Sequence, residues 1–182
     1  MTDSIYNTGL DKNPANFEAL TPVSFLERAA LLYPETEAVV HSNLSRNYAA
    51  VFKRCRQLAS ALAARGVGPG DTVAAILPNI PEMFELHFAV PMTGATFNAI
   101  NTRLDAKSVA FILDHAEAKV LFTDREFNAT VGAALPMIER NLTVVDVDDP
   151  LFDEGEPLGT LTYDNLLSEG SAQFEWVRPN DE

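Results

Sequence analysis

The stretch Thr72-Val-Ala-Ala-Ile-Leu77, followed by Pro78-Asn-Ile-Pro-Glu82, decides the fold class of this chain. Its first part carries apolar side chains at successive positions, which is typical of a strand that is buried on both faces of a sheet. Pro78 then breaks the strand, and Pro81 stands where a helix can begin because its fixed φ suits the first helical position. A doubly buried strand that leads into a helix predicts a parallel sheet covered by helices.

The segments on both sides of this stretch continue the alternation of helix and strand. Helical spacing of apolar residues, caps and proline breaks predict the helices, and short apolar runs predict the strands. We expect helices at 22–33, 49–65, 81–93, 106–116, 126–140 (interrupted at Pro136) and 162–167, and strands at 38–41, 45–48, 72–77, 95–100, 120–123 and 143–147. The fold class is therefore α/β, with a mostly parallel sheet flanked by helices.

Charge and cysteine usage exclude several classes of function. The 26 Asp and Glu against 13 Lys and Arg give a formal net charge of −13, which argues against a nucleic-acid partner because phosphate neutralisation needs clustered positive charge. No stretch approaches the roughly 18 apolar residues that a membrane span requires. The single cysteine, Cys55, leaves no internal disulfide and fits a reducing compartment. We expect a cytoplasmic chain with no membrane span.

The chain divides into two parts of different character. Residues 1–17 are polar, lack the apolar run of a secretory signal, and are expected to form an N-terminal arm. Residues 18–182 carry all the predicted helices and strands and are expected to form one α/β subdomain. Thr21 precedes Pro22 at the boundary, a pairing that favours a capped helix start.

Motifs for catalysis and for metal binding are missing from the sequence. The glycine cluster Gly66-Val-Gly-Pro-Gly70 closes a helix and precedes a strand, which is the reverse of a phosphate-binding loop, so we interpret it as a structural connection. His41, His87 and His115 are scattered, and no pair has the spacing of a metal site. We assign no catalytic residue and no metal ligand.

Acidic residues at strand ends offer one alternative function. Asp124 ends one predicted strand, and Asp146, Asp148 and Asp149 lie at the end of another. Carboxylates at the carboxyl ends of parallel strands can hold magnesium, as in receiver-type signalling modules. A receiver would also carry acids on an early strand, and 72–77 has none. A solvated acidic loop is the simpler interpretation, but the receiver remains an alternative.

Arg103 is the best candidate for a binding residue. The segment Asn101-Thr-Arg-Leu-Asp105 joins the carboxyl end of a strand to a capped helix, and ligands bind at that end of open α/β sheets. An arginine there could hold a phosphate or a carboxylate through two parallel hydrogen bonds. The competing interpretation is an exposed arginine that pairs with Asp105.

Several motifs in a fixed order resemble one enzyme family. They are Thr21-Pro-Val-Ser-Phe-Leu-Glu-Arg-Ala-Ala30, Gly66-Val-Gly-Pro-Gly-Asp71, Leu77-Pro-Asn-Ile-Pro-Glu82, Pro91-Met-Thr-Gly-Ala95, Asn101-Thr-Arg-Leu104 and Val120-Leu-Phe-Thr-Asp124. Together they resemble the N-terminal part of the AMP-forming acyl-CoA synthetases, within the adenylate-forming superfamily. Residues 85–92 and 98–105 are most similar to the branch that holds plant acyl-activating enzymes and bacterial methylthiopropionate-CoA or medium-chain acyl-CoA ligases.

The resemblance implies a two-step ligase reaction. A short- to medium-chain carboxylic acid attacks the α-phosphate of ATP-magnesium to give an acyl adenylate, and the thiol of coenzyme A then displaces AMP. The resemblance also implies that Arg103 lies near a phosphate of coenzyme A. The family's phosphate loop, adenine pocket, ribose-binding aspartate and lid lysine have no counterpart among these 182 residues.

We therefore expect an N-terminal fragment whose partner is the missing C-terminal portion of the same protein. Such a fragment should be inactive alone and should bind none of ATP, magnesium or coenzyme A tightly. Losing its partner should leave an apolar face uncovered, which favours a homodimer or aggregation. A subdomain that serves only as a packing scaffold is the remaining alternative.

Overall fold

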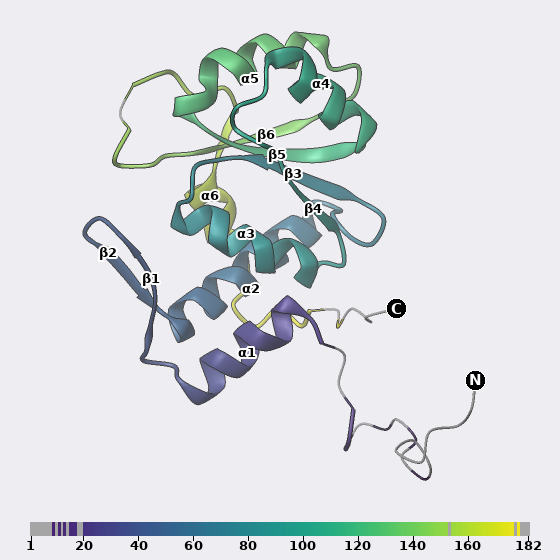
Figure 1. Ribbon diagram of the computed structural model, residues 1–182, viewed down its shortest axis with the longest axis vertical. Coiled ribbons are helices and arrows are strands. Elements are labelled where there is room, and N and C mark those ends of the chain that lie inside the picture. Colours follow the sequence, from purple (N-terminus) through teal and green to yellow (C-terminus); the bar gives the residue numbers. More distant parts are fainter. Residues whose placement is uncertain are drawn as a thin grey trace.

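A computed structural model describes residues 9, 11, 13, 15–17, 20–152, 154–176 and 178. The expected arm, residues 1–17, lies mostly outside the described residues. A parallel sheet forms the middle layer, with α4 and α5 on one face and α1, α2, α3 and α6 on the other (Figure 1). The predicted α/β class is confirmed. Among the described helices, none combines the length and the apolar character needed to cross a bilayer.

The sheet has five parallel strands in the order β4-β3-β5-β6-β7. They are β3 (Thr72–Ile76), β4 (Thr96–Ala99), β5 (Ala118–Asp124), β6 (Thr143–Val147) and β7 (Leu161–Thr162). The interior strand β3 pairs with both β4 and β5. Its side chains alternate between two cores, because Val73 and Ala75 face one helix layer while Ala74 and Ile76 face the other. This two-sided burial explains the continuous apolar run in the sequence.

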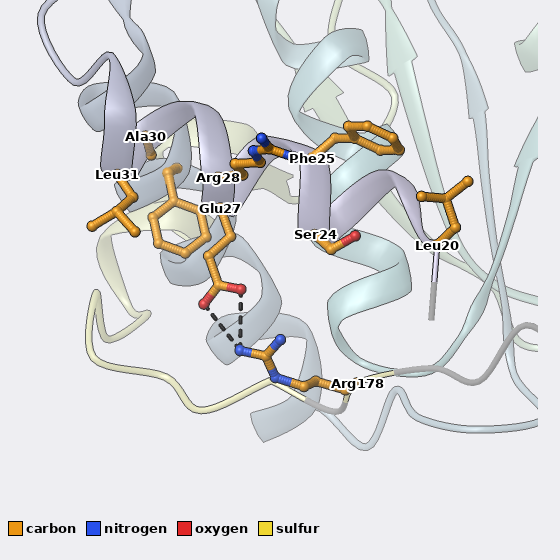
Figure 2. A pocket seen from close by; sticks show the side chains of 9 residues that line it. Leu20, Ser24, Phe25, Glu27, Arg28, Ala30, Leu31 and Arg178 are labelled. Carbon is orange, nitrogen blue, oxygen red and sulfur yellow. Dashed lines mark hydrogen bonds and ion pairs between the residues drawn. The ribbon is translucent and has the colours of Figure 1, made fainter. Parts of the chain in front are cut away.

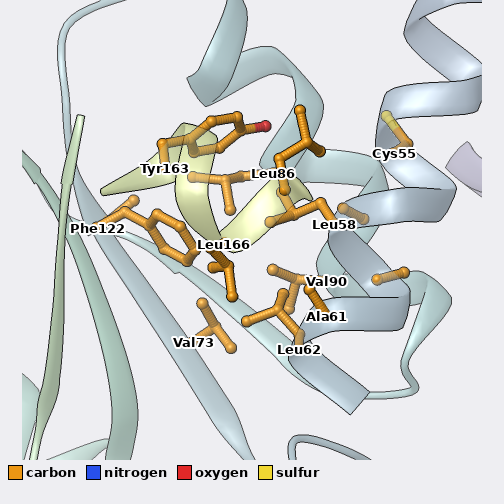
Figure 3. Close-up of a cluster of buried hydrophobic side chains, with 14 of the residues drawn as sticks. Cys55, Leu58, Ala61, Leu62, Val73, Leu86, Val90, Phe122, Tyr163 and Leu166 are labelled. Atoms are coloured by element: carbon orange, nitrogen blue, oxygen red, sulfur yellow. The ribbon is translucent and has the colours of Figure 1, made fainter. Parts of the chain in front are cut away.

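The larger core lies between the sheet and four helices, which are α1 (Pro22–Leu32), α2 (Tyr48–Ala64), α3 (Pro81–Met92) and α6 (Tyr163–Ser168). Side chains of α2 recur at helical spacing on its inner face, and Leu58 and Leu62 are fully buried there. Cys55 belongs to this face, as the sequence predicted. Phe122 of β5 meets Tyr163 of α6 edge to face, with ring centroids 6.0 Å apart (Figure 3).

The smaller core covers the opposite face of the sheet. It contains α4 (Ala106–His115) and α5 (Asn128–Ala134), and α5 lies between single 3-10 turns at Arg125–Phe127 and Leu135–Met137. Val109, Leu113 and Val131 are fully buried here. The helix expected at 126–140 is thus shorter, because Pro136 lacks the amide that would continue the helical ladder.

Two segments of the chain extend this layered unit. β1 (Glu37–His41) and β2 (Leu44–Asn47) form a separate antiparallel hairpin, whose turn places Ser42 at a φ of +51°. At the other end of the chain, β7 adds a fifth strand that pairs with Val145 and Asp146 of β6. The sequence did not predict β7, since two residues are too few to show a period. The chain then enters α6 directly.

Candidate functional site

The strand order reverses between β3 and β5, and this reversal fixes where a ligand site should lie. The connection after β3 leads outward to β4, whereas the connection after β5 leads the opposite way to β6. In open α/β sheets such a reversal opens a crevice outside the carboxyl ends of the two strands. Here the crevice is bordered by Leu77-Pro78-Asn79 on one side and by Asp124 on the other.

Asp124 supports a loop at this crevice. Its side chain is 1% exposed. One carboxylate oxygen accepts the amide of Glu126 at 2.8 Å, and the other accepts the amide of Asp149 at 3.1 Å. Burial raises the pKa of Asp124 above its ordinary value, although these amide hydrogen bonds act in the opposite direction. A buried carboxylate with both oxygens occupied is a poor acceptor for a phosphoryl group.

The acidic residues near β6 are also bound to backbone amides. Asp146 accepts the amides of Leu158 and Gly159 at 2.9 and 2.8 Å, one on each oxygen. Asp149 lies 2.9 Å from His41 Nε2 and accepts the amide of Leu151. Across the part of the chain that the structure describes, no group of three or more His, Cys, Asp or Glu side chains could hold a metal ion. These acids bind backbone amides on both sides of the 150–157 stretch, and the receiver alternative loses its magnesium donors.

Arg103 lies in the exposed loop between β4 and α4, at the carboxyl edge of the sheet. The side chain of Asn101 accepts the Arg103 amide at 3.0 Å and shapes the turn. Asp105 is turned the other way and caps α4 by accepting the Ser108 amide at 2.8 Å, a bond that lowers the pKa of Asp105. Within the described ranges no carboxylate pairs with the Arg103 guanidinium, so the pair with Asp105 is not formed.

Arg103 lies at the carboxyl edge of the sheet as expected, but outside the crevice between β3 and β5. β4 is an edge strand, so Arg103 stands beside the β3–β5 crevice, on its outer side. An exposed guanidinium at this edge can reach an anionic group of a ligand that extends out of the crevice.

The glycine cluster at residues 66–70 lies at the opposite, amino-terminal edge of the sheet. Gly66 and Gly70 adopt positive φ angles of +79° and +86°, which glycine tolerates best. Asp71 accepts the Gly68 amide and pairs with Lys119 Nζ at 2.6 Å, and this pair with Lys119 lowers the pKa of Asp71. The predicted structural connection between helix and strand is confirmed.

A buried charged cluster that the sequence did not predict lies on the face of the sheet covered by α2, α3 and α6. Glu85 of α3 is fully buried, and its Oε1 accepts Arg46 Nη1 at 2.8 Å and Arg54 Nε at 2.7 Å. Its Oε2 accepts the Tyr163 hydroxyl at 2.5 Å. Glu82, one helical turn earlier, also binds Arg46. The cluster thus ties the β1–β2 hairpin, α2, α3 and α6 together; we call it the Glu85 cluster.

The Glu85 cluster shifts the ionisation of the groups around it. Burial, followed by the negative charge of Glu85, raises the pKa of Tyr163 and of Cys55 well above their ordinary values. Burial alone would lower the pKa of Arg54, but its hydrogen bond and charge interaction with Glu85 raise it. All three groups therefore hold their protons at neutral pH, and two arginines offset two glutamates.

One sequence signal could have revealed this cluster. Glu85 stands directly before Leu86 and one turn before Ala89, both fully buried on the inner face of α3. A glutamate on the apolar face of a helix requires cationic partners. Arg54 is adjacent to the buried Cys55 on α2 and could have been proposed as one of them.

The strand order and the helices on both faces of the sheet define a doubly wound α/β unit. Residues 26–181 match the family of AMP-binding enzymes, and the chain therefore belongs to that family. The matched segment corresponds to the N-terminal part of adenylate-forming CoA ligases, as the motifs predicted.

Curated relatives match the chain in sequence, and a solved structure shares its fold. The chain is 41% identical to acetate/butyrate–CoA ligase AAE7, peroxisomal, of Arabidopsis thaliana, over 95% of this chain and 32% of the relative. It is 38% identical to acetate–CoA ligase CCL3 of Humulus lupulus, over 95% and 33%. The crystal structure of the anthranilate CoA ligase AuaEII matches 94% of this chain and 32% of its own, with a TM-score of 0.78 and 22% identity, which supports the fold alone. The chain thus spans about a third of its relatives.

Proposed function

We propose that this chain is the N-terminal part of an ATP-dependent, AMP-forming acyl-CoA ligase. The observation that carries the proposal is the 41% identity to an acetate/butyrate–CoA ligase over 95% of the chain. On this proposal the substrate is a short- to medium-chain carboxylic acid. The acid forms an acyl adenylate with release of pyrophosphate, and coenzyme A takes the acyl group with release of AMP.

In that reaction the described residues would form part of the ligand-binding crevice, and Arg103 would provide one contact with coenzyme A. An exposed guanidinium without a carboxylate partner suits an anionic ligand, so Arg103 would bind a phosphate of coenzyme A. The acids at the crevice do not fit a magnesium site, because backbone amides occupy the oxygens of Asp124 and Asp146. ATP and its metal would be held by residues outside this segment.

A pyrophosphate-release assay tests the ligase proposal. The 182-residue chain is compared with a fusion in which the remaining part of acetate/butyrate–CoA ligase AAE7 follows residue 182. Both receive ATP, magnesium, coenzyme A, and acetate, butyrate or octanoate in turn. The fusion should release pyrophosphate only when an acid is present, and the chain alone should release none. Turnover by the chain alone, or a folded fusion that is inactive with every acid, would contradict the proposal.

The role of Arg103 has its own test in the same fusion. Arg103→Ala should raise the KM for coenzyme A by about tenfold to a hundredfold, the value of a lost charge-assisted hydrogen bond, and leave acid-dependent ATP–pyrophosphate exchange unchanged. Dephospho-coenzyme A, which lacks the ribose phosphate, should be used equally well by both proteins if that phosphate is the contact. Lys107→Ala, one turn away on α4, is the matched control. An unchanged KM for coenzyme A would remove Arg103 from the site.

A cytoplasmic location belongs to the same proposal. It is supported by the lone reduced thiol of Cys55, which fits a reducing compartment. Some relatives carry the word peroxisomal in their names, among them AAE7. Imaging of a fluorescent fusion in the native cell would distinguish the two: diffuse signal supports the proposal, and punctate signal that coincides with peroxisomes refutes it.

A further inference from the structure

The outer face of α1 carries large apolar side chains that nothing in the described chain covers. Leu20 is 74% exposed, Phe25 55% and Leu31 77%. With Phe52 of α2 they line a hollow of about 720 Å³ along α1, whose polar edge carries Glu27, Arg28 and Arg178 (Figure 2). Single exposed apolar side chains are common on protein surfaces, but a group of them around one hollow is typical of an interface.

α1 is held firmly, so this apolar face is a fixed feature of the fold. Thr21 and Ser24 form a capping box, in which each side chain bonds the backbone of the other. On the inner face of the helix, Val23 and Leu26 are buried in the larger core. Rotation of α1 to hide Leu31 would expose these two residues, so the outer face needs a partner of its own.

Arg178, the last residue that the structure describes, lies at the edge of the same hollow. Arg56 of α2 donates to the carbonyl of Phe174 at 2.9 Å, and both Phe174 and Trp176 pack against the larger core. Arg178 then bonds both carboxylate oxygens of Glu27 at 3.1 and 3.2 Å, as Figure 2 shows. Arg178 is thus held beside α1.

We propose that the outer face of α1 is an internal interface, covered by the polypeptide that follows residue 182 in the longer protein. This inference rests on the proposed function. The curated relatives are about three times as long as the matched segment, so ample chain exists to cover the face. Arg178 is only four positions before residue 182, so the loop that would bring the continuation onto this face is short in sequence. A second copy is less suited, because two chains of net charge −13 repel each other.

Cysteine labelling tests this interface directly. Cys55 is buried and its thiol pKa is raised, so the native chain offers no reactive thiol of its own. Leu31→Cys should react quickly with a maleimide in the 182-residue chain and about tenfold or more slower in the AAE7 fusion. Phe111→Cys on α4, 66% exposed, is the matched control and should react quickly in both proteins.

A second experiment does not need the fusion. The remaining part of AAE7, produced separately, should associate with the 182-residue chain in sedimentation velocity, and Leu31→Glu should weaken this association by about tenfold or more while Phe111→Glu leaves it unchanged. Equal labelling of Leu31→Cys in chain and fusion, or association insensitive to Leu31→Glu, overturns the proposal. Protection of Leu31→Cys that rises with the concentration of the chain alone would assign the face to a homodimer and overturn it too. Neither readout needs turnover, so an inactive fusion leaves the interface test intact.

Discussion

The hydroxyl of Tyr163 donates to the buried carboxylate of Glu85 at 2.5 Å, across 78 positions of sequence. This bond joins α6, which follows β7, to α3, which follows β3. Arg46 and Arg54 complete the shell of Glu85 from the hairpin and from α2. A carboxylate satisfied by three donors from three other elements specifies one arrangement of those elements.

Removing the charge of Glu85 should destabilise the chain strongly. Glu85→Gln leaves Arg46 and Arg54 facing a neutral amide in a buried site, and breaking a buried pair in this way costs about 3–5 kcal/mol of unfolding free energy. Glu82→Gln is the matched control on the same helix; Glu82 is partly exposed, so its loss should cost about 1 kcal/mol or less. Urea unfolding followed by circular dichroism measures both. Equal effects for the two variants would contradict the buried role of Glu85.

Tyr163 should remain protonated in the native chain well above pH 10. Burial and then Glu85 raise its pKa well above 10, so the native state holds this proton more tightly than the unfolded state. Its contribution to stability is therefore complete below about pH 10, the unfolded pKa, and is lost as the pH rises through the folded pKa. Ultraviolet titration at 295 nm should show one late tyrosine that ionises together with unfolding.

Tyr163→Phe is the control for this titration, and the late component should vanish in it. If every tyrosine of the wild type titrates near pH 10 while the near-ultraviolet circular dichroism stays native, the buried Tyr163–Glu85 bond is absent.

The thiol of Cys55 should be inert in the native chain. It is fully buried, and burial together with Glu85 raises its pKa, so little reactive thiolate forms. An aromatic disulfide reagent at pH 8 should react about a hundredfold slower with the native chain than with the chain in 6 M guanidinium. Glu85→Gln, which loosens the surroundings, should speed the native reaction. Rapid labelling of the native wild type would contradict the packing of α2 against α3.

Any side chain at Gly170 should destabilise the chain. A Cβ at this position would lie 1.8 Å from the carbonyl oxygen of Gln57, so α6 would have to move away from α2. Gly170→Ala should cost about 1–3 kcal/mol, as overpacking of a close contact does. Gly68→Ala is the control, because the nearest atom to a Cβ there is Thr93 O at 4.0 Å. Thermal unfolding measures both, and a Gly170→Ala variant as stable as Gly68→Ala would refute the close approach.

Local patterns were enough to predict most of the layered fold. The apolar run at 72–77 marks β3 because both its faces are buried, and the spacing of Val51, Cys55, Leu58 and Leu62 marks α2. Pro81 and Asp105 mark helix starts that the structure confirms. These signals lie within one element, so a sequence displays them directly.

Features that depend on distant residues could not be predicted in the same way. β7 exists because Leu161 and Thr162 pair with β6. A two-residue strand is too short to show an apolar period, so its sequence does not reveal this partner. Asp124 and Asp146 were interpreted as solvated or metal-binding, whereas backbone amides from later loops occupy their oxygens. Arg103 was placed correctly at a carboxyl edge, but its distance from the crevice depends on strand order, which no local pattern encodes.

The proposed ligase joins an acid to AMP before coenzyme A takes the acyl group. Isotope transfer tests this most directly. The AAE7 fusion is given acetate labelled with ¹⁸O in both carboxylate oxygens, together with ATP, magnesium and coenzyme A, and the nucleotide product is analysed by mass spectrometry. Attack of the carboxylate on the α-phosphate predicts AMP that carries one ¹⁸O atom. Unlabelled AMP, or ADP in its place, would contradict the proposed acyl-adenylate reaction.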